Sequence, residues 1–272
     1  MDAHVHVFPP EVVSHRESYL GRDARFDDLY GSPEARIATA DEVIAEMDAS
    51  GVELSLVFGF AFDDQALCRM VNDYVIEAVS AYPTRLAGLA CVASHAPGAR
   101  AELERCLDAG LRGCGELAPK TGTEDEIAEL APIAACLRER QLPLMIHASE
   151  PVGHEYKGKG RFTPEACIAL AKTYQGLTVV LSHMGGGLFL YELMPEVRSL
   201  LADVLYDTAP VPYLYDPRVY EVAVLAVSAE KLIFGSDFPL LSPKRYFDGL
   251  ESLSAEERSA VQGGNARRVF NL

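Results

Sequence analysis

The sequence predicts an α/β fold in which a single domain, residues 1–272, forms a (β/α)8 TIM barrel. Short apolar runs rich in Val, Ile, Leu and Phe recur along the chain, and segments with helical periodicity separate them. Runs such as LTVVLSH (177–183) are apolar at successive positions, which is typical of parallel strands buried on both faces. A barrel of this type needs roughly 250 residues, and the chain has 272 with no Pro/Gly/Ser-rich or highly charged linker.

The strands are expected at residues 3–7, 54–58, 86–92, 112–117, 143–147, 178–183, 204–207 and 232–236. Helices are expected at residues 39–49, 64–81, 99–109, 123–139, 163–174 and 220–226. In the segment 99–109, Leu103, Cys106 and Leu107 share one helical face, and Gly110 suits the end of the helix. The first strand should pair with the last, which would close the barrel.

A doubly wound sheet is the main alternative to the barrel. Its dinucleotide signature is a glycine-rich turn after the first strand. The corresponding turn here reads FPPEVV (8–13), which favours the barrel.

The composition excludes several classes of partner and site. A formal net charge of −16 argues against nucleic acid and anionic membranes, which are themselves negative. None of the six cysteines forms a C-x-x-C pair, so a thiolate zinc site is not expected, and apolar runs around several of them predict buried thiols. The chain starts in a strand without an export leader, and no apolar run approaches the roughly 18 residues of a membrane span. We therefore expect a cytoplasmic protein.

Polar residues stand where the predicted strands end. His4 and His6 lie in the first strand, whose alternation places them on one face with Asp2. Later strands end in RGCGEL, LPLMIHA, VVLSH and LIFGSD, and these runs supply Glu116, His147, His183 and Asp237. Active sites of such barrels form at the carboxyl ends of the strands, so these side chains should meet at one rim. Imidazoles and carboxylates are ligands of zinc, manganese and iron, so the sequence predicts a divalent metal site.

Each of these residues also has a purely structural interpretation. His147 and His183, taken singly, suit hydrogen-bonded core histidines. Glu116 suits a buried ion pair, and Asp237 suits the N-cap of the next helix. The metal hypothesis depends on their occurrence together at the strand ends.

The sequence resembles the amidohydrolase superfamily, and within it the amidohydrolase-2 group that includes aminocarboxymuconate semialdehyde decarboxylase. The resemblance spans essentially the whole chain through DAHVHVFP (2–9), IHA (146–148), SHMGG (182–186), FGSDFP (234–239) and GGNARRVF (263–270). It implies a (β/α)8 barrel, a homodimer, and a metal with the ligands His4, His6, His147 and Asp237. It also places His183 beside the metal, where it orients water or substrate.

The number of metal ions, one or two, stays open. Some members of the wider superfamily carry a carboxylate at the end of a middle strand that bridges two ions, and Glu116 could take that place. His4, His6 and Asp237 would then hold the first ion. His147 and His183 would hold the second. The mononuclear decarboxylase-like group favours a single ion, with Glu116 beside it or against the substrate.

The ligand set suggests a mechanism based on activated water. Bound zinc lowers the pKa of water toward roughly 7. Asp237 would act as general base and then as general acid, while His183 would stabilise the oxyanion or position the nucleophile. Asp2 would fix an imidazole tautomer from behind the histidine pair.

The leading hypothesis is therefore a metal-dependent hydrolase of an ester, amide or lactone-like bond in a small, anionic substrate. The first alternative is a metal-dependent, non-oxidative decarboxylase of a carboxylic acid, which would use the same ligands. The second alternative is a catalytically silent barrel that serves as a binding module.

The segment GHEYKGKG (153–160) nearly matches a phosphate-binding P-loop. Gly160 stands where the P-loop needs Ser or Thr, and Thr163 with Pro164 predicts a later helix start, so we exclude nucleotide hydrolysis. The segment follows the fifth strand and should overhang the metal. Its basic residues are predicted to hold a carboxylate or phosphate of the substrate. They are His154, Lys157, Lys159 and Arg161.

Overall fold

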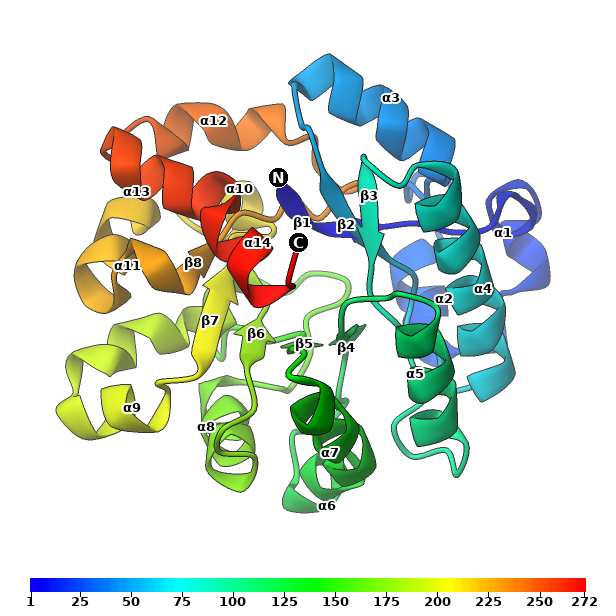
Figure 1. Cartoon of the computed structure of the whole chain (residues 1–272), viewed down its shortest axis with the longest axis horizontal. Helices are drawn as coiled ribbons and strands as arrows, with labels where there is room; N and C mark the ends of the chain where they lie inside the picture. The colour runs from blue at the N-terminus through cyan, green and yellow to red at the C-terminus, as the bar shows by residue number, and fades with distance from the viewer.

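Eight parallel strands surround the centre of the molecule, and helices cover them from outside (Figure 1). The computed structural model describes every residue from 1 to 272. The strands are β1 (Asp2–His6), β2 (Ser55–Phe58), β3 (Leu86–Gly88), β4 (Cys114–Leu117), β5 (Leu144–Ile146), β6 (Val179–Leu181), β7 (Val204–Asp207) and β8 (Leu232–Ile233). This arrangement confirms the predicted (β/α)8 barrel.

The barrel wall closes at two places where regular strand pairing is interrupted. One sheet has the order β1-β2-β3 and the other the order β4-β5-β6-β7-β8. A single bridge between Ala90 and Cys114 joins β3 to β4, and one between Val5 and Phe238 joins β1 to the segment after β8. Asp237 N also donates to His4 O at 2.9 Å. The first strand thus meets the last, as predicted, and His4 becomes a neighbour of Asp237.

The helices follow the strands in the expected alternation. They are α1 (Pro10–Ser14), α2 (Ala24–Tyr30), α3 (Ala40–Ser50), α4 (Gln65–Ala81), α5 (Ala99–Asp108), α6 (Glu124–Glu129), α7 (Ala131–Arg140), α8 (Pro164–Thr173), α9 (Pro195–Leu200), α10 (Val211–Leu214), α11 (Val219–Val227), α12 (Lys244–Leu250), α13 (Ala255–Ser259) and α14 (Asn265–Val269). A long 3-10 segment, η2 (His183–Leu193), follows β6.

Several predicted boundaries were wrong, and among them the strand expected at 86–92 ends at Gly88. The helix expected at 123–139 is divided into α6 and α7 around Leu130, because Pro132 has no N–H to donate and its ring would clash with the preceding turn. The strand expected at 232–236 ends at Ile233. Beyond it Asp237 takes a left-handed backbone with φ of 61°, and the bridge from Phe238 to Val5 is what still joins the chain to β1.

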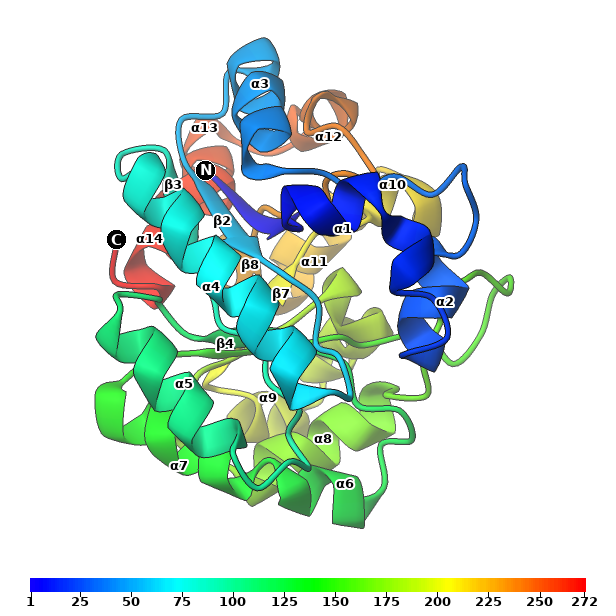
Figure 2. The ribbon, with the colours of Figure 1, turned by 90° about the vertical axis from the view of Figure 1, so that its right-hand side faces the viewer.

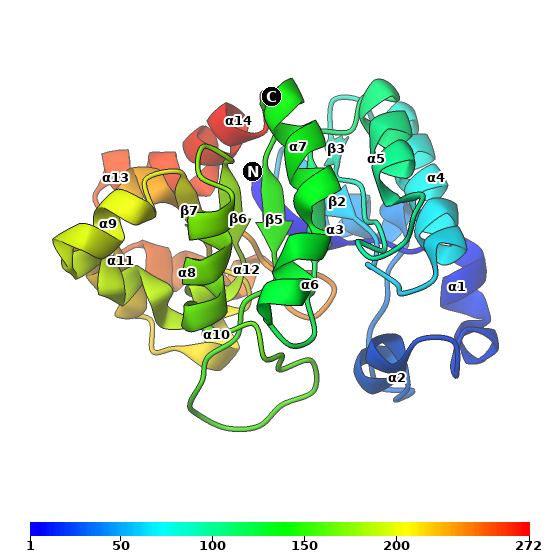
Figure 3. The same ribbon diagram turned by 90° about the horizontal axis from the view of Figure 1, so that it is seen from below.

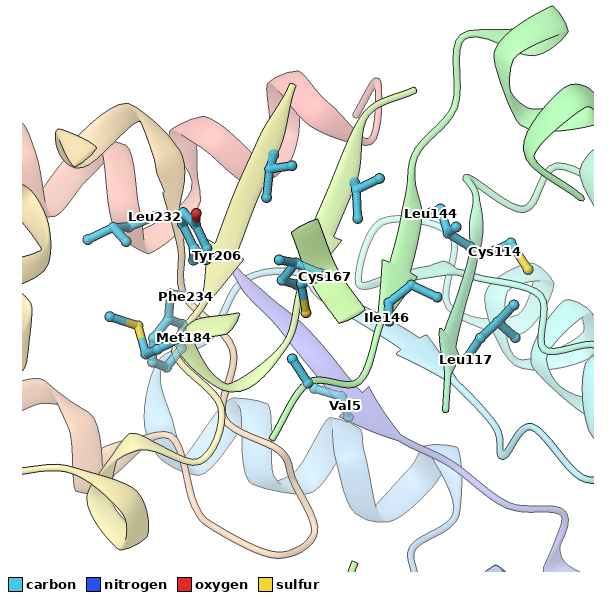
Figure 4. Close-up of a cluster of buried hydrophobic side chains, with 14 of the residues drawn as sticks. Val5, Cys114, Leu117, Leu144, Ile146, Cys167, Met184, Tyr206, Leu232 and Phe234 are labelled. Carbon is cyan, nitrogen blue, oxygen red and sulfur yellow. The ribbon is translucent and has the colours of Figure 1, made fainter. Parts of the chain in front are cut away.

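Apolar side chains form separate clusters inside and outside the barrel wall. Met145 of β5 belongs to the inner cluster with Leu56 of β2, and Phe270, just after α14, lies in the same cluster. The neighbours of Met145 along β5, Leu144 and Ile146, belong to the outer cluster between strands and helices (Figure 4). Alternation along a barrel strand produces this division. All six cysteines are buried and free, whereas the sequence predicted burial for several of them.

Two segments project from the end of the barrel where the strands terminate. One contains α1 and α2, and the other is the loop between β5 and α8 (Figures 2 and 3). Both termini lie at the opposite end (Figure 3). No helix combines the length and the apolar character that crossing a membrane requires.

Gly235 is predicted to be essential for the contact between β1 and the segment after β8. A Cβ atom at this position would lie 2.5 Å from His4 Cβ. Gly235→Ala should therefore push the two segments apart and lower the free energy of unfolding by about 1–3 kcal/mol, the usual cost of overpacking. Gly98→Ala, at a position with open space around it, should cost less than about 1 kcal/mol. Denaturant unfolding measures both, and equal losses would contradict this interpretation of the contact.

Candidate metal centre

The predicted metal ligands meet at the carboxyl end of the barrel. β1 carries His4 and His6, β4 carries Glu116, and His147, His183 and Asp237 follow β5, β6 and β8. All of them except His4 line one cavity of about 540 Å³. His4 is fully buried and lies beside the lining residue Asp237, whose Oδ1 is 3.6 Å from His4 Nε2.

The donor atoms fall into two groups that share Glu116. In each group, one atom per residue lies within 4.8 Å of the others. The first group is His4, His6 and Glu116, and the second is Glu116, His147 and His183. Asp237 Oδ1 adjoins the first group, at 3.6 Å from His4 Nε2 and 3.4 Å from His6 Nε2.

The second group surrounds the Glu116 carboxylate. Glu116 Oε1 lies 3.3 Å from both His147 Nδ1 and His183 Nε2. An irregular strand register between Cys114 and Leu117 accompanies this placement. Gly115 supports it, because its φ is 138° and a Cβ there would lie 2.5 Å from Met145 O. Only glycine allows β4 to pass β5 so closely beside the cluster.

Backbone and carboxylate acceptors orient three of the imidazoles. His4 Nδ1 lies 2.7 Å from Asp207 Oδ2, His6 Nδ1 lies 3.0 Å from Gly59 O, and His183 Nδ1 lies 2.5 Å from Ala209 O. A carbonyl or carboxylate can only accept, so each Nδ1 carries a proton and Nε2 faces the cluster. This is the outer hydrogen bonding that histidine ligands of metals normally have.

Asp207 is a site residue that the sequence analysis missed. It also accepts a hydrogen bond from His183 N at 2.9 Å. Asp207 is the last residue of the predicted strand 204–207, and this position was the sequence signal that could have identified it as a site residue. The role predicted for Asp2 was wrong, because Asp2 accepts from Ser236 N at 2.9 Å and holds β1 against the β8 segment. Its carboxylate touches the backbone N of His4 and not the ring.

Two buried atoms at the centre of the cluster have no hydrogen-bond partner. They are His4 Nε2 and Glu116 Oε1, and they belong to the same group of donor atoms. A buried polar atom without a partner is costly, and natural structures seldom leave one unexplained. A cation between these atoms would satisfy both. The donor set of imidazole nitrogens and carboxylate oxygens also suits zinc, manganese or iron.

The imidazoles lie in a strongly negative environment. Burial lowers the pKa of His4, but the carboxylates of Asp207 and Glu116 outweigh it and raise the pKa to about 10. Burial likewise opposes the shift at His183, where Glu116 raises the pKa to about 9. At His147 burial dominates, helped by the charge of Arg25, and lowers the pKa to about 4.

The same attraction between imidazoles and carboxylates lowers the pKa values of the carboxylates. Burial would raise the pKa of Glu116, but His147 and His4 hold it well below its usual value. Burial is similarly overcome at Asp237, where His6 and His4 lower the pKa to about 2. These carboxylates are therefore ionised and attract positive charge, which a divalent cation can supply in exchange for protons.

Arg25 of α2 is a second residue that the sequence analysis missed. It lines the cavity, and its buried Nε has no hydrogen-bond partner. Nothing in the sequence pattern around it indicates a site, because α2 reaches the cavity only through the fold of the segment after β1. A guanidinium in this position can bind a carboxylate through paired hydrogen bonds.

Four basic residues of the loop between β5 and α8 were predicted to bind the substrate, and two of them line the cavity. His154 and Lys157 line the cavity. Lys159 does not, because its ammonium group donates to the loop carbonyls of His154, at 3.0 Å, and Val152, at 3.2 Å. Arg161 is exposed away from the cavity lining. The helix after the loop begins at Pro164 with Thr163 as N-cap, as predicted.

Known proteins resemble this chain over most of its length. It is 23% identical over 287 residues to gamma-resorcylate decarboxylase of Polaromonas sp. strain JS666, an alignment that covers 85% of this chain and 87% of the relative. It is 26% identical over 243 residues to 2-keto-4-carboxy-3-hexenedioate hydratase of Sphingobium sp. strain SYK-6, covering 73% and 70%. Neither relative is named as a hydrolase.

Solved structures share the fold. The crystal structure of 5-carboxyvanillate decarboxylase from Sphingomonas paucimobilis superposes with a TM-score of 0.80 at 21% identity, covering 100% of this chain and 98% of that one. Dihydroxybenzoic acid decarboxylase from Polaromonas sp. JS666, solved with manganese and 2-nitroresorcinol, gives 0.74 at 19% identity, covering 100% and 96%. The model of the family described as Amidohydrolase (Amidohydro_2) matches residues 1–272. The chain therefore belongs to this amidohydrolase family, as its motifs predicted.

Proposed function

We propose that this protein is a metal-dependent, non-oxidative decarboxylase of a small aromatic or conjugated carboxylic acid. Arg25 is the observation that carries the proposal, because its side chain lines the same cavity as the cluster and its buried Nε has no hydrogen-bond partner. A guanidinium without a partner in this cavity favours the binding of a negatively charged substrate. A neutral ester, amide or lactone would leave this charge without a partner.

The relatives support the decarboxylase over the hydrolase that led the sequence analysis. Decarboxylation and hydration are the reactions named for the two curated relatives. Each of those reactions acts on a carboxylic acid, which agrees with the demand of Arg25.

We propose that a divalent cation, zinc, manganese or iron, lies among the donor atoms of the cluster. On one side of Glu116, the donors are His4, His6 and Asp237. On the other side, the donors are His147 and His183. The shared Glu116 allows one ion or two. When bound, the metal supplies Lewis acidity toward oxygen atoms of the substrate. Manganese is the ion named in the structures of two related decarboxylases.

The residues of the cavity supply the remaining chemistry. Arg25 binds the acid and orients it, and the rings of Tyr30 and Phe60 in the cavity lining provide flat apolar surfaces for a conjugated substrate. Loss of carbon dioxide breaks one carbon–carbon bond and leaves its electron pair on the substrate carbon. That carbon must then receive a proton. His183 lines the cavity beside the cluster, and because its pKa is raised to about 9 it holds a proton that it can deliver.

Asp207→Asn should weaken metal binding. The amide would present a donor to His4 Nδ1 where the carboxylate now accepts at 2.7 Å, so the proton of the ring would move to Nε2 and remove the lone pair from the cluster. We expect the dissociation constant for Mn²⁺ to rise about 10- to 100-fold with an unchanged circular dichroism spectrum. Titration calorimetry measures the affinity, and an unaltered constant would remove His4 from the metal site.

The Mn²⁺-loaded protein should release carbon dioxide from an aromatic acid. A panel of hydroxybenzoic acids and their methyl esters tests this with gas and product analysis. We expect carbon dioxide in equal amount to the acid consumed and, in deuterium oxide, one deuterium at the vacated carbon. Ester hydrolysis without carbon dioxide would restore the hydrolase hypothesis. A hydrated product that keeps every carboxylate would indicate a hydratase, and binding without turnover a binding module.

Arg25→Gln should raise KM for the acid more than it lowers kcat. Loss of a charge-assisted hydrogen bond corresponds to about a 10- to 150-fold change in binding. Arg25→Lys keeps the positive charge but lacks the planar guanidinium, so its KM should lie between those of the wild type and Arg25→Gln. Arg138→Gln is the matched control, because Arg138 contacts only the Gln175 carbonyl at the surface. An unchanged KM in Arg25→Gln would contradict the role of Arg25.

A further inference from the structure

Ser149 lies fully buried between a histidine of the cluster and the loop that covers the cavity. Its Oγ is 3.1 Å from His147 Nε2 and accepts a hydrogen bond from Gly160 N at 2.9 Å. Its backbone N donates to Phe162 O at 2.9 Å. One hydroxyl oxygen thus contacts both the imidazole and the far end of the loop.

The position of this hydroxyl fixes the proton of His147. Nδ1 of His147 faces the cluster, at 3.3 Å from Glu116 Oε1 and 2.9 Å from His183 Nε2. A neutral imidazole that presents a lone pair from Nδ1 must carry its proton on Nε2. Ser149 Oγ is placed to accept that proton while its second lone pair receives the Gly160 N–H.

The loop itself is held by residues next to Ser149 and by α2. Glu150 accepts from the hydroxyl groups of Tyr156, at 2.9 Å, and Tyr215, at 3.1 Å. Gly158 N donates to Asp28 Oδ2 in α2 at 3.2 Å. Residues that line the cavity include His154, Tyr156, Lys157 and Gly158 of this loop. A movement of this loop therefore acts on Ser149 through the Gly160 hydrogen bond and through Glu150.

We propose that Ser149 is a positioning residue that couples the seating of this loop to the orientation of His147. With the loop seated over the cavity, Gly160 N–H holds the hydroxyl in place, and the hydroxyl holds the imidazole with Nδ1 toward the cluster. With the loop lifted, the imidazole loses this constraint. The inference concerns the protein's own hydrogen bonds and does not depend on which reaction it catalyses.

The test is the tautomer of His147 in the full-length, metal-free protein at one fixed pH. Nitrogen-15 labelling of histidine gives the ring signals by NMR, and His147→Gln identifies those of His147. We expect a single Nε2–H tautomer in the wild type and a mixture in Ser149→Ala. Hydrogen exchange at the Gly160 amide should accelerate about fivefold or more when its acceptor is lost. Identical ring signals in wild type and Ser149→Ala would overturn the proposal.

Two further variants separate positioning from a general structural effect. Ser55→Ala removes another buried serine hydroxyl, one that has no hydrogen-bond partner and lies at the opposite end of the barrel. It should leave the His147 signals unchanged, and an equal change would overturn the proposal. Asp28→Ala removes the acceptor of Gly158 N and thereby loosens the loop while the Ser149 hydroxyl stays, so it also serves if Ser149→Ala does not fold. Faster Gly160 exchange with a mixed His147 tautomer supports the coupling, and faster exchange with a single tautomer refutes it.

Discussion

The buried carboxylate of Glu116 is the constraint on which the site depends. It lies in the wall of the barrel, within 3.3 Å of two imidazole nitrogens, and Oε1 has no hydrogen-bond partner. A buried negative charge is stable only beside positive charge. The imidazoles that surround it provide that charge when they are protonated, and a divalent cation provides it more directly. The pKa values of His4 and His183 are both raised although burial alone would lower them, which reflects the attraction of the nearby carboxylates for positive charge.

The fold satisfies this constraint by bringing the two ends of the chain together. The contact between β1 and the segment after β8 makes His4 a neighbour of Asp237, and the parallel strands between them add Glu116, His147 and His183 at the same rim. The segment with α1 and α2 and the loop before α8 then project over this rim (Figures 2 and 3). The wall of the barrel thus fixes the cluster, while the projecting segments supply Arg25, His154 and Lys157, which line the cavity.

The part of the site carried by strand ends could be predicted from the sequence. Glu116, His147 and Asp237 are recognisable because they stand where apolar runs end, and parallel strands in a barrel all end at one rim. His4 is recognisable because it shares a face of the first strand with His6. Asp207 also ends such a run, but an aspartate behind a histidine has no pattern of its own. Arg25 and Ser149 were not predictable, because their roles depend on how irregular segments fold back over the cavity.

The same limit explains the errors in the loop and the fold. Lys159 and Lys157 are equally basic in sequence, and only the folded loop shows that Lys159 is held by its own carbonyls while Lys157 reaches the cavity. Pro132 could have divided the predicted helix, since the rule that it breaks an interior hydrogen bond is local. The reaction was the least predictable feature, because a hydrolase and a decarboxylase of this family can use one set of ligands.

Anomalous diffraction from crystals grown with Mn²⁺ tests the central claim most directly. The account predicts a strong peak about 2.0–2.3 Å from His4 Nε2 and from a Glu116 oxygen. A second peak on the His147 and His183 side of Glu116 would establish a bridged pair, and its absence a single ion. Density for manganese only at surface carboxylates, with none among these donors, would contradict the account.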